Sequence, residues 1–362
     1  MLGATLSRWT LAYFGAGVIF LLTAEALMVL GVGYPASALR APQTLLLVHC
    51  VTIGWLSLLM CGALCQFVPV LVAGPLYSNA MAFPALLLIL AGLLALLASF
   101  LQLAGLMPMI PHCFLAASVL LGSGFALAIW TLGRTLAAAW PLNLPAQFVT
   151  VGLCSVAATV AFGIIFTLGY AGYTHTLFLR ALQAHGLPLH VLAGLGGWLT
   201  FTAMGVSHRL LAMFMLSPEL DGAPTRWTLR LGTLALAIVI IAGPVAIAAR
   251  GNPDLALLIA GLISLACLAL YARDVVQLYR KRVRRVIELN SRMAGIALAP
   301  LAAATLLTIA LAALGLFGRY GGALVFLVCF GWLSGLGLAK LYKIVAFVTW
   351  LECYGPVLGK TP

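Results

Sequence analysis

Long apolar runs recur along the whole of this 362-residue chain and constrain its fold more than any other feature. Each run is about 20 to 28 residues long, which lets a helix cross a hydrocarbon layer of roughly 30 Å with its backbone hydrogen-bonded internally. Hydrophobic residues make up 64% of the chain and charged residues only 7%, whereas soluble domains carry about 25% charged residues. The sequence therefore predicts an all-α polytopic membrane helix bundle.

Hydropathy predicts about ten transmembrane helices with short connections. Their expected ranges are 11–33, 45–72, 80–106, 114–137, 147–172, 188–215, 228–249, 254–275, 294–317 and 322–350. The first is expected to be a retained span, because its apolar run is long and lacks a clear cleavage site for a signal peptide. Since the connections leave no room for a soluble catalytic domain, residues 1–362 are expected to form a single integral membrane domain.

The net charge of +12 follows the positive-inside rule better than it fits nucleic-acid binding. Basic residues are scattered at helix ends and form no stripe that could follow a phosphate backbone. Most of them fall on one side of a ten-helix bundle: Arg8, Arg134, Arg209, Arg226, Arg230, residues 280–285, Lys340, Lys343 and Lys360. A minority falls on the other: Arg40, Arg180, Arg250 and Arg319. We therefore expect a cell inner membrane protein with both termini cytoplasmic.

One motif occurs three times at even spacing. Residues 49–71, 190–214 and 330–348 share a Gly-Trp-Leu-Ser/Thr core, and they lie in predicted helices 2, 6 and 10. The three copies therefore cross the membrane in the same direction. Gly and Trp are common in membrane helices, so chance could produce one such pair. Three evenly spaced copies favour a repeat with pseudo-threefold symmetry about an axis along the membrane normal.

Histidine is costly inside a membrane, so histidines in predicted spans are candidates for a functional site. His49 and His190 lie a few residues inside matched helices, six and eight residues before their tryptophans. Two facing neutral imidazoles suit a six-coordinate heme iron. They are too few for a structural zinc ion, and copper would need His112 or His185 as well. For His112, His175 and His185, near the outer side, simple solvation is the alternative.

His208, Arg209 and Glu25 also stand in apolar segments. His208 is a candidate for hydrogen bonding, for heme ligation from the inner side, or for contact with an acidic lipid or quinone headgroup. Arg209 is expected to extend to the cytoplasmic interface. Glu25 is the carboxylate expected well inside a span, where burial would keep it neutral and suit it to a proton relay. A hydrogen bond to the backbone or an arginine partner is the alternative for Glu25.

Eight cysteines occur, mostly in predicted helices, and none forms a CxxC pair. Buried cysteine usually acts as a small apolar side chain, so a disulfide framework or a zinc cluster is not expected. The chain also has no Gly-rich phosphate loop and no CxxCH motif. These absences disfavour nucleotide-driven transport and covalently attached heme.

The repeat and the outer histidines resemble subunit I of the heme-copper oxidases and nitric oxide reductases. The segments "HCVTIGWLSLLMCGALCQFVPVL", "GVSHRLLAMF" and "KLYKIVAFVTW" are also similar to shorter membrane proteins related to that subunit. The resemblance, which spans most of helices 2 to 10, implies that His49 matches a low-spin heme ligand and His190 a copper ligand. Helix 7 has no His-His pair and no histidine follows His208. The resemblance therefore implies a short divergent member without the complete heme-copper centre.

That resemblance implies a protein binding heme b, with copper as a second possibility. It would act in electron transfer, or in handling or sensing oxygen or nitric oxide, with a redox subunit or cytochrome as partner. Any enzymatic activity would be that of an oxidoreductase. Two other hypotheses stay open: a copper or heme transporter or assembly factor, and a membrane subunit that has the fold without a cofactor.

Overall fold

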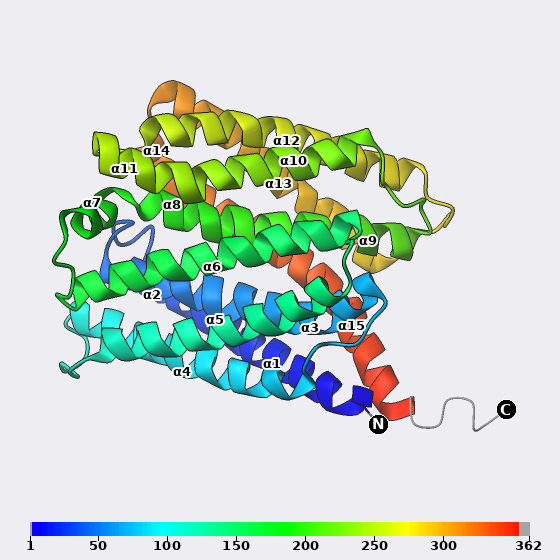
Figure 1. The fold of residues 1–362 in the computed structure, drawn as a ribbon, viewed down its shortest axis with the longest axis horizontal. Helices are drawn as coiled ribbons and strands as arrows, with labels where there is room; N and C mark the ends of the chain where they lie inside the picture. The colour runs from blue at the N-terminus through cyan, green and yellow to red at the C-terminus, as the bar shows by residue number, and fades with distance from the viewer. Residues whose placement is uncertain (1, 355–362) are drawn as a thin grey trace.

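The computed structural model describes residues 2–354, and all secondary structure in that range is helical. Ten helical rods in this range are long and apolar enough to cross a membrane. They are Leu6–Val29, Pro42–Val72, Asn79–Leu103, Cys113–Ala138, Leu144–Tyr170, Leu187–Met215, Ala223–Ala249, Asp254–Arg280, Leu289–Leu314 and Phe317–Tyr354. The rods run roughly along one direction in Figure 1. The prediction of an all-α polytopic bundle with about ten spans is confirmed.

Six rods consist essentially of one α-helix each. These are α1 (Leu2–Val29), α4 (Ala82–Leu103, after the short η2, Asn79–Met81), α5 (Cys113–Ala138), α6 (Leu144–Tyr170), α12 (Asp254–Arg280) and α13 (Leu289–Leu314). The other four contain a π-helical segment between two α-helices. They are α2–η1–α3 (Pro42–His49, Cys50–Ser57, Leu58–Val72), α8–η3–α9 (Leu187–Val191, Leu192–Phe201, Thr202–Met215), α10–η4–α11 (Ala223–Ala237, Ile238–Ala242, Gly243–Arg250) and α14–η5–α15 (Phe317–Phe326, Leu327–Ser334, Gly335–Tyr354).

Apart from the start of α1, the observed helix ends lie within about five residues of the predicted ones, as expected for boundaries read from hydropathy. α1 begins at Leu2, nine residues before the predicted start at 11. α12 continues to Arg280, beyond the predicted end at 275. Hydropathy ended the predicted span early because the last turns carry polar residues, although the chain there is still helical. The short α7 (Leu177–His185) was not predicted. It lies in the loop after α6, and Thr176 caps it by accepting a hydrogen bond from the Leu179 backbone N–H at 3.3 Å.

Both ends of the described chain lie at one end of the bundle (Figure 1), which we call the inner end. The Nε of Arg8 lies 2.9 Å from an oxygen of Glu352, so the first and last helices pair there. Lys360, predicted on this side, lies outside the described residues. The opposite, outer end carries α7 and the turn that leads into α2.

The Gly-Trp-Leu-Ser/Thr cores of the three motif copies lie in three of the four described π-helical segments, η1, η3 and η5. A π-helix bonds each N–H to the carbonyl five residues back, which widens the turn, and such segments are rare outside functional sites. The three segments contact one another in the bundle. The side chains of Ser57 and Ser334 also bond to the carbonyl five residues back. Their hydroxyls donate to the carbonyls of Thr52 and Cys329, each at 2.7 Å.

Buried tryptophans join these segments. The Nε1 of Trp198 in η3 donates to Oγ of Ser57 in η1 at 2.9 Å, and Nε1 of Trp55 in η1 donates to Oγ of Ser334 in η5 at 2.8 Å. By the same pattern Trp332 in η5 would bond Thr200 in η3. Within the described chain, Nε1 of Trp332 has no hydrogen-bond partner. The repeated motif thus forms two of three equivalent links between the segments.

Glycines in the repeat allow the helices to approach closely. A Cβ placed on Gly205 would lie 2.2 Å from Cβ of Phe148 in α6, and one on Gly62 would lie 2.7 Å from Cβ of Tyr13 in α1. Real side chains do not approach so closely, so only glycine fits at these crossings without a shift of the helices. Small residues at these two positions therefore let the helices pack closely, as is common between membrane helices.

The outside of the bundle carries large apolar side chains that the other described residues leave uncovered. Ile241, Leu262 and Leu306 are each 60% exposed or more, although they lie in the middle of long helices. A soluble protein rarely exposes apolar surface over whole helices. The lipid bilayer is the solvent that fits this surface.

Candidate functional site

His49 and His190 come together toward the outer end of the bundle. His49 is the last residue of α2, directly before η1, and His190 lies in α8 before η3. Their ring centres are 6.4 Å apart, with the ring planes inclined by 30°. Relative to the tryptophans, the two histidines differ by two residues, and η3 (10 residues) is longer than η1 (8 residues) by the same amount. The two extra residues between His190 and its tryptophan thus accompany a longer π-helical segment.

Backbone carbonyls hold both imidazoles in one tautomer. Nδ1 of His49 lies 2.7 Å from the carbonyl oxygen of Leu45, and Nδ1 of His190 lies 3.1 Å from that of Thr159 in α6. A carbonyl only accepts, so Nδ1 must be the protonated nitrogen on each neutral ring. The lone pair of each ring is therefore on Nε2, which is the usual arrangement for a histidine that ligates a metal.

Aromatic rings surround the histidine pair. Phe100 in α4 lies 5.3 Å from His49 between ring centres, and Phe166 in α6 lies 5.5 Å from His190 with its edge toward the imidazole. Gly163, one turn before Phe166, leaves space beside His190, since an added Cβ would lie 3.5 Å from its Cε1. Both imidazoles are only partly buried. The surroundings are apolar, and the helix backbone supplies the polar contacts.

The distance between the rings fits a shared metal ligand better than a direct hydrogen bond. Two imidazoles on opposite sides of one metal ion have ring centres about 6 Å apart, because each metal–nitrogen bond is about 2 Å long and each ring nitrogen lies about 1 Å from its ring centre. A direct hydrogen bond of about 3 Å between two ring nitrogens would bring the centres to about 5 Å. The observed 6.4 Å is close to the first arrangement.

No third protein ligand joins the pair in the described part of the chain. Residues 2–354 contain no group of three or more His, Cys, Asp or Glu side chains suited to a metal ion. His112 and His185, the residues that a copper site would need, are exposed at the outer end. His175 is exposed there as well. The donor set is thus two neutral imidazoles, which fits the two axial positions of a heme iron.

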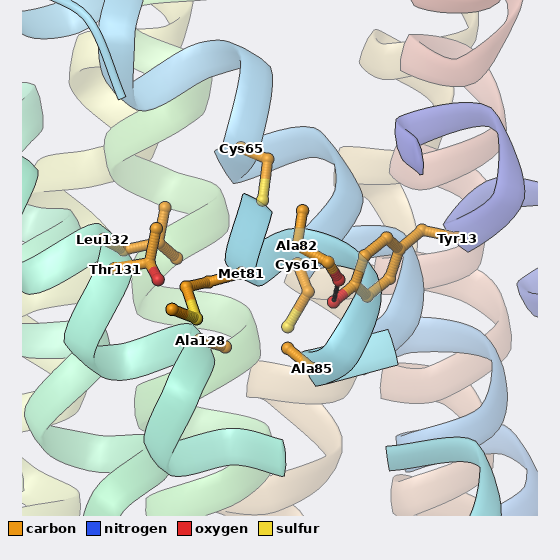
Figure 2. Close-up of a pocket in the computed structure, with 9 residues that line it drawn as sticks. All are labelled: Tyr13, Cys61, Cys65, Met81, Ala82, Ala85, Ala128, Thr131 and Leu132. Atoms are coloured by element: carbon orange, nitrogen blue, oxygen red, sulfur yellow. Dashed lines mark hydrogen bonds between the residues drawn. The ribbon is translucent and has the colours of Figure 1, made fainter. Parts of the chain in front are cut away.

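Two cavities in the described structure lie away from the histidines. A closed one of about 10 Å³ lies between α1, α3, α4 and α5 and is lined by Tyr13, Cys61, Cys65, Met81, Ala82, Ala85, Ala128, Thr131 and Leu132 (Figure 2). It has room for about one water molecule. The other, of about 570 Å³, is open and is lined by Trp9 and residues 75–80. Neither cavity includes a candidate histidine.

His208 belongs to a different, inner group. Its side chain in α9 is 3% exposed, and its Nε2 lies 3.5 Å from Oδ2 of Asp274 in α12, whose side chain is 2% exposed. The rings of Tyr271 and Phe148 each lie 5.4 Å from the imidazole between centres, and the Tyr271 ring is nearly perpendicular to it, at 88°. With Asp274 beside it, His208 has a buried carboxylate partner rather than a lipid headgroup at the surface.

Asp274 corrects the sequence-based expectation about carboxylates. Glu25 was expected to be the carboxylate well inside a span, but its side chain in α1 is exposed on the outside of the bundle. Glu25 is therefore not buried between helices, and its role in a proton relay stays a prediction. Asp274 was missed because the predicted span ended at 275, which placed this residue at the helix end. The observed helix continues for six residues after Asp274, and the Asp274 side chain is buried.

The basic positions of the repeat have acidic partners at the inner end. Arg209 pairs with Glu219, and Nζ of Lys343, at the equivalent repeat position, lies 2.8 Å from an oxygen of Glu288. Arg284 also pairs with Glu288. Arg209 thus reaches the inner surface, as expected, where a carboxylate of the following loop pairs with it.

Sequence reasoning also missed buried polar residues next to these pairs. Lys340 in α15 is 7% exposed, and Asn290 and Ser291 in the first turn of α13 are fully buried. Lys340 was assigned to the inner charged surface and the other two to a loop. The spacing of the two lysines was the available indication for Lys340. Lys340 and Lys343 are three residues apart and so lie on one face of a helix.

Comparison of the chain with protein-family models, curated proteins and solved structures finds no match. The resemblance to the oxidase subunit therefore stays a prediction from the sequence. What the chain itself establishes is a polytopic membrane protein of about ten spans with two histidine sites, one toward the outer end and one toward the inner end.

Proposed function

We propose that this chain is a heme-binding protein of the cell inner membrane, in which His49 and His190 would hold the iron. It acts in electron transfer, or in handling or sensing a diatomic gas such as oxygen or nitric oxide. One observation carries the proposal: two partly buried imidazoles have ring centres 6.4 Å apart, and a backbone carbonyl holds Nδ1 of each. Bound heme would supply reversible one-electron chemistry.

The residues around the pair have definable tasks. The carbonyls of Leu45 and Thr159 fix the ring orientation and keep Nε2 of each imidazole available as a donor. Phe100 and Phe166 provide an apolar surface that excludes water from the ligands. Burial of this kind is one of the means by which a protein sets the potential of a heme.

The arrangement of the three motif copies supports the same proposal. The contacts among η1, η3 and η5 and the two tryptophan–serine bonds fit a pseudo-threefold bundle like that of the heme-copper oxidase subunit. Two of the copies carry a histidine on the outer side, and Phe326 and Leu324 stand at those levels in the third. One bis-histidine centre, and no second heme with copper, is what this chain can supply.

Absorption spectroscopy tests the proposal. The full chain is expressed with ample heme, purified in detergent and compared with His49→Ala and His190→Ala, with His112→Ala and His185→Ala as controls. We expect a Soret band that both test variants lose and both controls keep. A colourless wild-type protein would overturn heme binding, and metal analysis of that sample would show whether it carries copper instead.

The topology is part of the same proposal. The excess of basic residues at the inner end, including Arg209, Arg284 and Lys343, supports an orientation with that end in the cytoplasm. The histidine pair would then lie toward the outer face. A redox partner that docks outside the membrane would be the nearer one to exchange electrons with this site.

A further inference from the structure

Polar side chains accumulate between four helices in the inner half of the bundle, apart from the outer histidine pair. α9 contributes His208, α12 contributes Asp274, α13 contributes Asn290 and Ser291, and α15 contributes Lys340. Each is less than 10% exposed. Ionisable residues inside a membrane are costly and usually mark a pathway or a relay. The inference below depends only on this group and does not rest on heme binding.

Contacts between α13 and α15 place these residues at successive depths. Glu288 and Lys343 pair at the inner surface. Further in, Gly335 packs against Ala297 and Gly331 against Pro300. Lys340 is three residues further into the bundle than Lys343, which is about 4.5 Å along a helix. Asn290 and Ser291 come two and three residues after Glu288, so they stand just behind the surface pair.

The series continues toward the centre of the membrane. Asp274 lies six residues before the inner end of α12, and His208 contacts it from α9. One turn deeper, Tyr271 lies 5.4 Å from His208 and 6.5 Å from Trp332 of η5, both between ring centres. At the inner end of the series, the Tyr279 hydroxyl donates to the carbonyl of Ser291 at 2.6 Å. Polar groups thus extend from the surface pair to the middle of the bundle.

Many polar atoms in this series have no hydrogen-bond partner within the described protein. They include Nζ of Lys340, both amide atoms of Asn290 and Oγ of Ser291. The 3.5 Å between His208 and Asp274 is also too long for a good hydrogen bond. A buried polar group without a partner costs about 1–3 kcal/mol, and more if it is charged. Such groups in native proteins are usually satisfied by internal water.

The chemistry of these atoms favours water over a bound cation. Donors and acceptors are mixed, since Lys340 only donates, Asp274 accepts when ionised, and Asn290 and Ser291 do both. The ammonium of Lys340 would repel a cation, and the described residues offer no group of three His, Cys, Asp or Glu side chains to hold one. A row of water molecules satisfies both kinds of atom.

We propose that this group holds a row of internal water molecules that carries protons between the inner surface and the His208–Asp274 pair. A proton leaves the aqueous phase near Glu288 and Lys343, passes along the water and the Ser291 hydroxyl, and is accepted by a ring nitrogen of His208. The imidazolium so formed is stabilised by the Asp274 carboxylate. Release of the proton follows the same steps in reverse, so no other reactant is consumed.

The groups that face His208 are consistent with this role. α12 presents Asp274 and Tyr271, α6 presents the apolar Phe148, and α9 itself adds Arg209, which is paired with Glu219 at the surface. Lys340 of α15 lies over Phe214 of α9, with its Nζ 5.4 Å from the ring centre. One carboxylate therefore lies next to the imidazole, and the nearest cations are directed toward the inner end.

Water-edited solid-state NMR tests the proposal on the full chain in lipid bilayers. With ¹⁵N-histidine labelling, the ring signal of His208 is assigned by its loss in His208→Asn, and its polarisation build-up from water is measured. We expect rapid build-up for His208, slowed about fivefold in Ser291→Val and in Lys340→Met, which remove polar atoms from the row. Ser99→Val is the matched control, because Ser99 is equally buried but bonds only within α4.

The outcomes are separable. The signals of His49 and His190 report whether each variant has kept its fold, so a slowed His208 signal in a folded variant supports the water row. Absence of transfer from water to His208 in the wild type would overturn the proposal. Build-up unchanged in both Ser291→Val and Lys340→Met would overturn it as well. Heme content has no part in this test, so failure here and failure of the proposed function are independent results.

Discussion

The indole Nε1 of Trp55 donates a hydrogen bond to Oγ of Ser334 at 2.8 Å, although 279 positions separate the two residues in sequence. Both side chains are buried, and both belong to π-helical segments. Since Trp198 bonds Ser57 in the same way, the motif that repeats in sequence is also the motif that joins distant helices.

Removal of the serine hydroxyls should therefore weaken the fold. We expect Ser334→Ala and Ser57→Ala to lower the free energy of unfolding by about 1 kcal/mol each, because an indole N–H loses its acceptor in an apolar interior. Thermal unfolding in detergent measures this. Thr200→Ala is the matched control at the third repeat position, where no bond to Trp332 forms. An equal loss of stability in all three variants would contradict the role of the two bonds.

Gly205 should tolerate no side chain. Gly205→Ala would bring a Cβ to 2.2 Å from Cβ of Phe148, so we expect it to cost about 1–3 kcal/mol by forcing α9 and α6 apart. Gly196→Ala on the same rod is the control, because an added Cβ there meets nothing within 4 Å. The yield of monodisperse protein and its melting temperature report both changes. A stable Gly205→Ala protein would show that the crossing is looser than described.

The buried Lys340 ammonium should lower the stability of the fold. This ammonium has no carboxylate partner among the described residues, so Lys340→Met, which keeps the stem of the side chain, should leave the melting temperature unchanged or raise it by a few degrees. Lys343→Met removes a half-exposed partner of Glu288 and should change stability by less than about 1 kcal/mol. A strongly destabilised Lys340→Met protein would indicate that the ammonium has a carboxylate partner.

If His49 ligates heme iron, free imidazole should replace its side chain. We expect His49→Gly to lose the absorption band and millimolar imidazole to restore it, because the deletion leaves the rest of the site in place. A histidine needed only for folding would not be replaced in this way. His112→Gly should show no response to imidazole. Failure of rescue in a folded His49→Gly protein would argue against ligation.

The orientation in the membrane can be tested with Cys353, which is exposed close to the inner end. A membrane-impermeant maleimide should label Cys353 in broken membranes and leave it unmodified in intact spheroplasts. In His175→Cys, the new thiol in the outer loop should react in intact spheroplasts. Labelling of Cys353 from outside would reverse the proposed orientation.

Hydropathy predicted the rods of this fold because each span must be apolar to enter lipid, and this requirement acts on single segments. It could not predict that the rod containing Lys340 and the rod containing Asp274 bury these charges, because that depends on which helix faces which. The repeat placed His49 and His190 in matched helices at a similar depth, and their imidazoles do lie close together. Their role as ligands stays a prediction. Asp274 was missed because a carboxylate near a span end ordinarily reaches water.

The π-helical turn in η3 has a consequence for the two ends of its rod. Each residue of an α-helix advances the chain by about 100° around the axis, so the residues added at a widened turn rotate everything beyond them. His190 precedes η3 and His208 follows it. The widened turn thus sets the azimuth of the outer imidazole, which lies beside His49 of α2, relative to the inner imidazole, which lies beside Asp274 of α12. Deletion of one residue within 192–201 would leave both histidines in the chain but aim them at the wrong neighbours.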